Sequence, residues 1–252
     1  MFLEIKLLFK NNKFNFLNQF EINQRKYKSS LLKLGNHTVL AIIALIAIGS
    51  ATRVMEAGLA CPDWPLCYGT FLPLTHMNLR VFLEWFHRLD AFLVGILIVT
   101  QFALSFLWRK FLPNWLPKIY SFLVFLIILQ GTLGALTVIN MLSSLSVMSH
   151  LLIAFIILIT AIYVNQALIN KAMDKNILWW KYLLSIPLSL TLVQSVIGVR
   201  LSSTWSAHLC LSMNQNCIVL NSHKLFAIPV FISIISIILV SLFKFDLFRN
   251  NW

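Results

Sequence analysis

Four ionisable side chains stand close together where an apolar stretch of the chain begins: Glu84, His87, Arg88 and Asp90. On a helix, Glu84, His87 and Arg88 share one face, because residues three and four positions apart are neighbours. Charged groups inside a bilayer cost roughly 2.5 kcal/mol or more each, so they usually line a functional interior. The motif therefore predicts a site with a cofactor beside a proton-handling group. An ion pair between Glu84 and Arg88 is the simpler alternative.

The elements that must position this motif are expected to be membrane-spanning helices. The chain of 252 residues is 59% hydrophobic and 11% charged, with a mean hydropathy of +0.83, whereas soluble domains have about 25% charged residues. Charged and polar breaks leave apolar stretches of spanning length at about 34–52, 84–107, 119–139, 150–170, 181–200 and 224–244. We therefore predict an all-α integral membrane protein with six transmembrane helices.

The net charge of +12 is distributed unevenly. Basic residues concentrate before the first predicted span, after the second, after the fourth and after the sixth. The positive-inside rule then places both termini inside and the alternate loops outside. This scatter favours contact with the lipid bilayer and no nucleic-acid partner. Residues 1–33 form a basic N-terminal extension, expected either as a surface helix or as a loose segment.

All four cysteines fall in loops that are predicted to lie outside, as the pairs Cys61/Cys67 and Cys210/Cys217. An oxidising location permits two local disulfides, although the spacing alone does not establish their geometry. The chain contains no C-x-x-C motif. We favour structural cross-links, with a redox role as the alternative.

The sequence also resembles itself. The pattern H-[RK]-L-x-A occurs at 87–91 and again at 223–227, each time after a cysteine pair. Such a repeat indicates two related helical bundles. A weaker repeat, Gln-x-x-x-Gly at 130–134 and at 194–198, is compatible with ordinary helix packing.

Two histidines, His87 and His150, begin the second and fourth predicted spans at the outer side. Imidazoles on facing helices of a four-helix unit can hold a haem iron from both faces. A lone membrane histidine is more often a packing residue, but two at matching depth favour ligation. His223 occupies the equivalent place in the second repeat. Arg88 then has a second candidate role, as the partner of a haem propionate. The remaining histidines are expected to be ordinary polar residues: His37, His76 and His208.

Three segments resemble the haem A synthase family. Residues 53–69 resemble its first outer loop, and Glu84-Trp85-Phe86-His87-Arg88 resembles its second-helix signature. Residues 133–138, leading to His150, resemble its third and fourth helices. The resemblance runs from about residue 36 to 230, and the paired cysteines make the chain similar to the bacterial, cyanobacterial-type branch.

This resemblance implies oxidation of the C8 methyl of haem O to the formyl group of haem A, for use by terminal oxidases. His87 and His150 would flank the substrate haem and its iron, and Glu84 would be the essential acidic residue. Cys61 and Cys67 would form the loop disulfide.

The family fold implied is an eight-helix protein of two four-helix bundles. The six predicted spans would make one complete bundle, residues 34–170, and half of a second, residues 171–252, with the last two helices expected to be missing. In the second bundle, His223 would be one ligand of an electron-passing haem b. Expected partners are haem O synthase and oxidase-assembly factors, in a bacterial plasma membrane or a thylakoid, and a homo-oligomer is allowed.

Two other functions fit parts of the sequence. A quinone-linked thiol oxidoreductase would use the outer cysteine pairs but would leave Glu84 and the histidines unexplained. A non-catalytic haem-binding or assembly protein is compatible with the expected shortening. Substitution of the cysteines tests the first alternative, and substitution of Glu84 tests the second.

Overall fold

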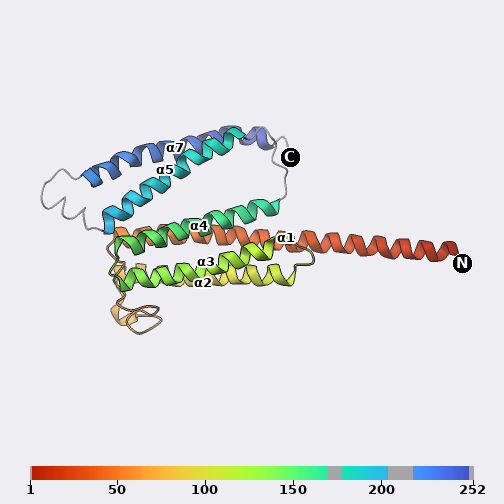
Figure 1. Cartoon of the computed structure of the whole chain (residues 1–252), viewed down its shortest axis with the longest axis horizontal. Helices are drawn as coiled ribbons and strands as arrows, with labels where there is room; N and C mark the ends of the chain where they lie inside the picture. The colour runs from red at the N-terminus through yellow and green to blue at the C-terminus, as the bar shows by residue number, and fades with distance from the viewer. Residues whose placement is uncertain (1, 170–177, 204–217, 250–252) are drawn as a thin grey trace. The chain divides into compact units, whose positions relative to one another are not determined.

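The computed structural model describes residues 2–169, 178–203 and 218–249 (Figure 1). Its elements are α1 (Phe2–Val54), the short 3-10 helix η1 (Leu74–His76), α2 (Leu79–Leu107), α3 (Leu116–Ile139), α4 (Ser144–Ile169), α5 (Leu178–Ser203) and α7 (Ile218–Arg249). The predicted all-α architecture is confirmed.

Five of the described helices contain segments long and apolar enough to cross a membrane. They are Gln19–Val54, Leu79–Leu107, Leu116–Ile139, Ser144–Ile169 and Leu220–Val240. The fifth predicted span corresponds to α5, whose apolar stretch, Ser185–Leu201, is shorter. The chain is thus a multi-pass membrane protein.

The chain divides into two compact units. The first comprises residues 1–138 and 150–170, and the second comprises residues 139–149 and 171–252. In the first unit, α1 to α4 run alongside one another (Figure 1). Their shared core includes Leu31 and Ile42 of α1, Val94 and Ile98 of α2, Leu116, Tyr120 and Leu123 of α3, and Ile157, Val164 and Leu168 of α4. This packing brings the ionisable motif of α2 and His150 of α4 into one helical unit.

The N-terminal extension is continuous with the first predicted span, because α1 begins at Phe2. The first 34 residues contain neither glycine nor proline, so no residue type there interrupts a helix. Tyr27 stacks on Trp108 with ring centroids 4.6 Å apart, and Phe20 lies 5.1 Å from the ring of Phe111. From about residue 20 the extension is therefore a packed part of the first unit.

Polar side chains, most of them buried, connect the helices of the first unit. Gln101 of α2 donates to the hydroxyl of Thr38 of α1 at 2.7 Å and accepts from the hydroxyl of Tyr120 of α3 at 3.1 Å. Asn165 of α4 donates to Asn36 of α1 at 3.1 Å. Because these groups satisfy one another, they help to fix the packing of the four helices.

The second unit is built around α5 and α7, which lie side by side (Figure 1). Each of the two helices contains an internal proline, Pro187 in α5 and Pro229 in α7. A proline inside a helix removes one backbone hydrogen bond and crowds the preceding turn. Packing of α5 against α7 therefore has to stabilise both helices beyond what their own backbone bonds provide.

Candidate functional site

Loop 55–78 joins α1 to α2 and covers the beginning of α2. Its backbone turns at Glu56, Tyr68 and Gly69, all of which have positive φ angles. The side-chain oxygen of Asn78 accepts the backbone N–H groups of Arg80 and Val81 at 3.0 and 3.1 Å, which caps the first turn of α2.

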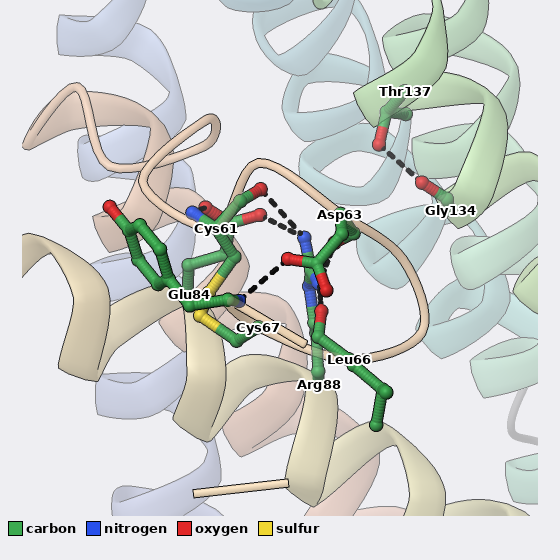
Figure 2. A network of polar contacts seen from close by, with 9 residues as sticks. Cys61, Asp63, Leu66, Cys67, Glu84, Arg88, Gly134 and Thr137 are labelled. Carbon is green, nitrogen blue, oxygen red and sulfur yellow. Dashed lines mark hydrogen bonds and ion pairs between the residues drawn. A yellow bond between two sulfur atoms is a disulfide. The ribbon is translucent and has the colours of Figure 1, made fainter. Parts of the chain in front are cut away.

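Arg88 of α2 binds the loop through its guanidinium group (Figure 2). Nη1 donates to the backbone carbonyls of Asp63 and Leu66. Nη2 donates to the carbonyl of Cys61 at 3.3 Å and to the carboxylate of Glu84. The guanidinium therefore holds three loop carbonyls and one carboxylate, which uses most of its five N–H groups.

The carboxylate of Glu84 is buried between α2 and the loop, with only 4% of the residue exposed. One oxygen accepts the backbone N–H of Cys61 at 2.8 Å, and the other forms the ion pair with Arg88. Both bonds are charge-assisted and stronger than neutral hydrogen bonds. The ion pair that the sequence spacing allowed is present, while the proton-handling role of Glu84 stays a prediction.

A disulfide joins Cys61 and Cys67 across the same loop, with their Cα atoms 4.8 Å apart. The two residues are 0% and 2% exposed and pack against Val81 and Trp85. The indole N–H of Trp85 also donates to the carbonyl of Phe71 at 2.6 Å. The loop is thus cross-linked internally and bonded to α2 at several points. The other predicted pair, Cys210 and Cys217, lies outside the described residues.

Asp63 closes the far side of the loop. Its carboxylate accepts the backbone N–H groups of Tyr68 at 2.6 Å and Gly69 at 2.8 Å. Desolvation alone raises the pKa of Asp63, but the N–H groups of Gly69 and Tyr68, with the charge of Arg88, outweigh it and hold the pKa below its usual value. The ionised form of Asp63 therefore stabilises the loop.

His87 lies one turn beyond Glu84 on α2, against α1. A Cβ atom on Gly49 would lie 2.9 Å from Cε1 of the imidazole, so the ring packs directly on the helix backbone. The carbonyl of Leu45 also interacts with the ring. The Nδ1 atom is buried and has no hydrogen-bond partner.

His150 of α4 has the same relationship to α3. A Cβ atom on Gly134 would lie 3.3 Å from its Cε1 atom, and Nε2 of Gln130 lies 3.3 Å from its Nε2 atom. Its Nδ1 atom is likewise buried without a partner. The imidazoles of His87 and His150 lie close enough for their charges to interact. The first unit thus presents two histidines with an unpartnered ring nitrogen each, on its second and fourth helices.

The second unit repeats this arrangement between α5 and α7. A Cβ atom on Gly198 would lie 2.9 Å from Cε1 of His223, and Nε2 of Gln194 lies 3.5 Å from Nε2 of the same ring. The Nδ1 atom of His223 is also buried without a partner.

No group of three His, Cys, Asp or Glu side chains within the described ranges could hold a bare metal ion. A pair of histidines fits iron in haem better, because the porphyrin supplies the equatorial ligands and the protein supplies the axial ones. The remaining described histidines make local contacts only: His37 with the Lys33 carbonyl at 2.7 Å, and His76 with the Tyr68 ring at 4.1 Å. His208 lies outside the described residues.

The sequence interpretation missed the glycines that face the imidazoles and the carbonyls that Arg88 binds. The only available signal was the Gln-x-x-x-Gly repeat at 130–134 and 194–198, whose members contact histidines in both units. Gly49 has no such flanking glutamine, since Leu45 stands four residues before it.

Comparison with known proteins matches residues 34–244 to the COX15-CtaA family, described as cytochrome oxidase assembly protein. The haem A synthase of Shewanella oneidensis is 32% identical over 70% of this chain and 58% of its own length. That of Rhodopseudomonas palustris is 29% identical over 66% of this chain and 57% of its own length. That of Bacillus pumilus is 29% identical over 56% of this chain and 47% of its own length.

The chain spans somewhat more than half the length of the first two of these relatives, 58% and 57%. The family match covers most of the chain, including residues of both units and the three candidate ligands His87, His150 and His223. Its range includes loop 55–78 and the second-helix motif. The chain therefore belongs to the COX15-CtaA family of cytochrome oxidase assembly proteins.

Proposed function

We propose that this chain takes part in haem A biosynthesis by oxidising the C8 methyl of haem O to a formyl group. The observation that carries this proposal is the pair His87 and His150, which lie in one unit on its second and fourth helices with their imidazoles close enough for their charges to interact. Relatives named haem A synthase support the substrate and the product.

In this proposal His87 and His150 hold haem O as the substrate, each from one face. Conversion of a methyl to a formyl group removes four electrons from the carbon, which an external oxidant has to accept, and adds one oxygen atom. With water as the source of that oxygen, four protons are released for each formyl group formed. A carboxylate near the substrate is therefore useful as a proton acceptor, and Glu84 stands one turn from His87.

In this proposal Arg88 holds the loop, and the propionate contact stays an untested alternative. Its ion pair with Glu84 and its bonds to the loop carbonyls of Cys61, Asp63 and Leu66 make it the residue that holds loop 55–78 on α2. It acts on the substrate site through Glu84, because the same guanidinium fixes one of the two carboxylate oxygens.

The second unit would bind a haem b, with His223 as one ligand. The fit rests on the place of His223 in the repeat and on its packing against Gly198. Such a haem passes electrons when bound. Haem O synthase, oxidase-assembly factors and an outer position of loop 55–78 complete the proposal and follow from the family and from the charge distribution.

The alternative of a thiol oxidoreductase has less support from the first cysteine pair. A disulfide that exchanges with a partner must be reached by the attacking thiolate. Cys61 and Cys67 are 0% and 2% exposed and lie within the loop that Arg88 holds. This burial favours a structural role for the bond.

The test compares Glu84→Gln with the double variant Cys61→Ser/Cys67→Ser, in membranes that contain haem O. The amide oxygen introduced by Glu84→Gln can still accept the N–H of Cys61, so we expect this variant to fold and to keep haem but to form no haem A. The cysteine variant should form less haem A without losing it. Glu56→Gln, in the same loop, is the control. Unchanged haem A formation by Glu84→Gln would refute the catalytic role of Glu84, and complete loss in a folded cysteine variant would favour thiol chemistry.

A further inference from the structure

The same three residue types meet between neighbouring helices in both units. In the first, Gln130 and Gly134 of α3 face His150 of α4. In the second, Gln194 and Gly198 of α5 face His223 of α7. The glycine lets the ring approach the helix, and the glutamine, one turn before it, reaches the Nε2 atom.

The amide can only donate at this contact, because the Nε2 atom of glutamine has no lone pair to offer. The imidazole must therefore accept at its own Nε2 atom, which places its proton on Nδ1. Iron binds an imidazole through a ring lone pair. The amide thus engages the lone pair at Nε2 that a metal would need.

In the second unit a further hydrogen bond holds the glutamine beside the ring. Gln194 also donates to the backbone carbonyl of His223 at 2.8 Å, which holds its amide beside the ring. His87 differs, because Leu45, whose side chain carries no amide, stands at the position before Gly49 that Gln130 holds before Gly134.

We infer that Gln130 and Gln194 are positioning residues that occupy the Nε2 atoms of His150 and His223 before haem binds and release them to the iron. This inference rests on the proposed function in taking haem as the ligand. His150 and His223 are then ligands that a glutamine amide occupies before haem binds, whereas no glutamine amide occupies His87. Haem binding then costs one amide–imidazole hydrogen bond at each glutamine.

The test is a titration of the haem-free, full-length chain with haemin, followed by the Soret absorbance. All variants carry His223→Ala, so that only the first unit is measured. Gln130→Leu removes the donor at nearly constant size. Gln130→Asn keeps an amide but is one methylene too short to reach His150. Gln166→Leu makes the same chemical change at an exposed position of α4 and is the matched control.

Both Gln130 variants should lower the Kd for haemin by about twofold to tenfold, because one net hydrogen bond no longer competes with the iron. Gln166→Leu should leave the Kd unchanged. An unchanged or higher Kd in folded Gln130→Asn would overturn the inference while leaving the proposed function intact. If His87→Ala/His150→Ala binds haemin as well as the parent does, the proposed function fails, and with it the inference.

Discussion

Replacing Arg88 by methionine should release loop 55–78 from α2. Methionine keeps most of the length of the side chain but removes every donor to the carbonyls of Cys61, Asp63 and Leu66 and leaves Glu84 buried without its cation. Removal of one partner of a buried ion pair costs about 3–5 kcal/mol. The side chains of Arg88 and Glu84 are 15% and 5% exposed, so we take the lower end, about 3 kcal/mol.

This loss is measurable as the rate at which a phosphine reductant cleaves the Cys61–Cys67 disulfide. Because both cysteines are buried, reduction requires the loop to open first. A decrease of about 3 kcal/mol in the free energy of opening should speed reduction roughly 150-fold. Mass spectrometry of the alkylated loop peptide separates this disulfide from Cys210 and Cys217.

Arg80→Met is the matched control. Arg80 pairs with Glu56 at 3.9 Å, and their side chains are 60% and 37% exposed. An exposed pair contributes at most about 1 kcal/mol, so reduction should be less than about tenfold faster in this variant. Equal rates in Arg88→Met and Arg80→Met would refute the conclusion that Arg88 holds the loop.

Three further predictions follow from the geometry. Gly49→Ala should weaken haemin binding, because the new Cβ atom would lie 2.9 Å from the ring of His87. Gly131→Ala is the control and should leave haemin binding unchanged, because its Cβ atom meets no atom within 4 Å. Soret titrations of the two variants measure the difference. Gln101→Leu should lower the free energy of unfolding by about 1–3 kcal/mol, because the buried hydroxyls of Thr38 and Tyr120 would lose their hydrogen bonds to the amide. Thermal unfolding in detergent measures this loss. The pKa of Asp63 is lower in the folded loop than in the unfolded chain. Asp63 therefore stabilises the folded loop fully at a pH above its ordinary pKa, and this stabilisation is lost as the pH falls through the lowered pKa. The disulfide should therefore be reduced faster below roughly pH 4, and this rise should be absent in Asp63→Asn.

Several features were predictable because they depend on local sequence. Apolar length and charged breaks gave helices close to those observed, and i,i+4 spacing anticipated the ion pair of Glu84 with Arg88. The disulfide between Cys61 and Cys67 joins residues only six positions apart. The continuation of α1 through the N-terminal extension was not predictable, because a basic segment of mixed composition fits a surface helix or a loose segment as well as a packed helix.

The surroundings of the histidines were not predictable in the same way. Which residue of α1 faces His87 depends on the rotation of one helix against the other, and nothing in the sequence singles out Gly49 for that position. The loop carbonyls that Arg88 binds are backbone groups, which every residue carries, so no residue type reveals them. The roles of His87, His150, His223 and Glu84 in haem chemistry stay predictions.

The most direct test of the proposed function is chromatographic identification of the haems extracted from cells that co-express this chain with a haem O synthase. The parent chain should yield haem A or its hydroxylated intermediate, and His87→Ala/His150→Ala should yield neither. Haem O alone, from a parent chain shown to be folded in the membrane, would contradict the account, as would the same products from both chains.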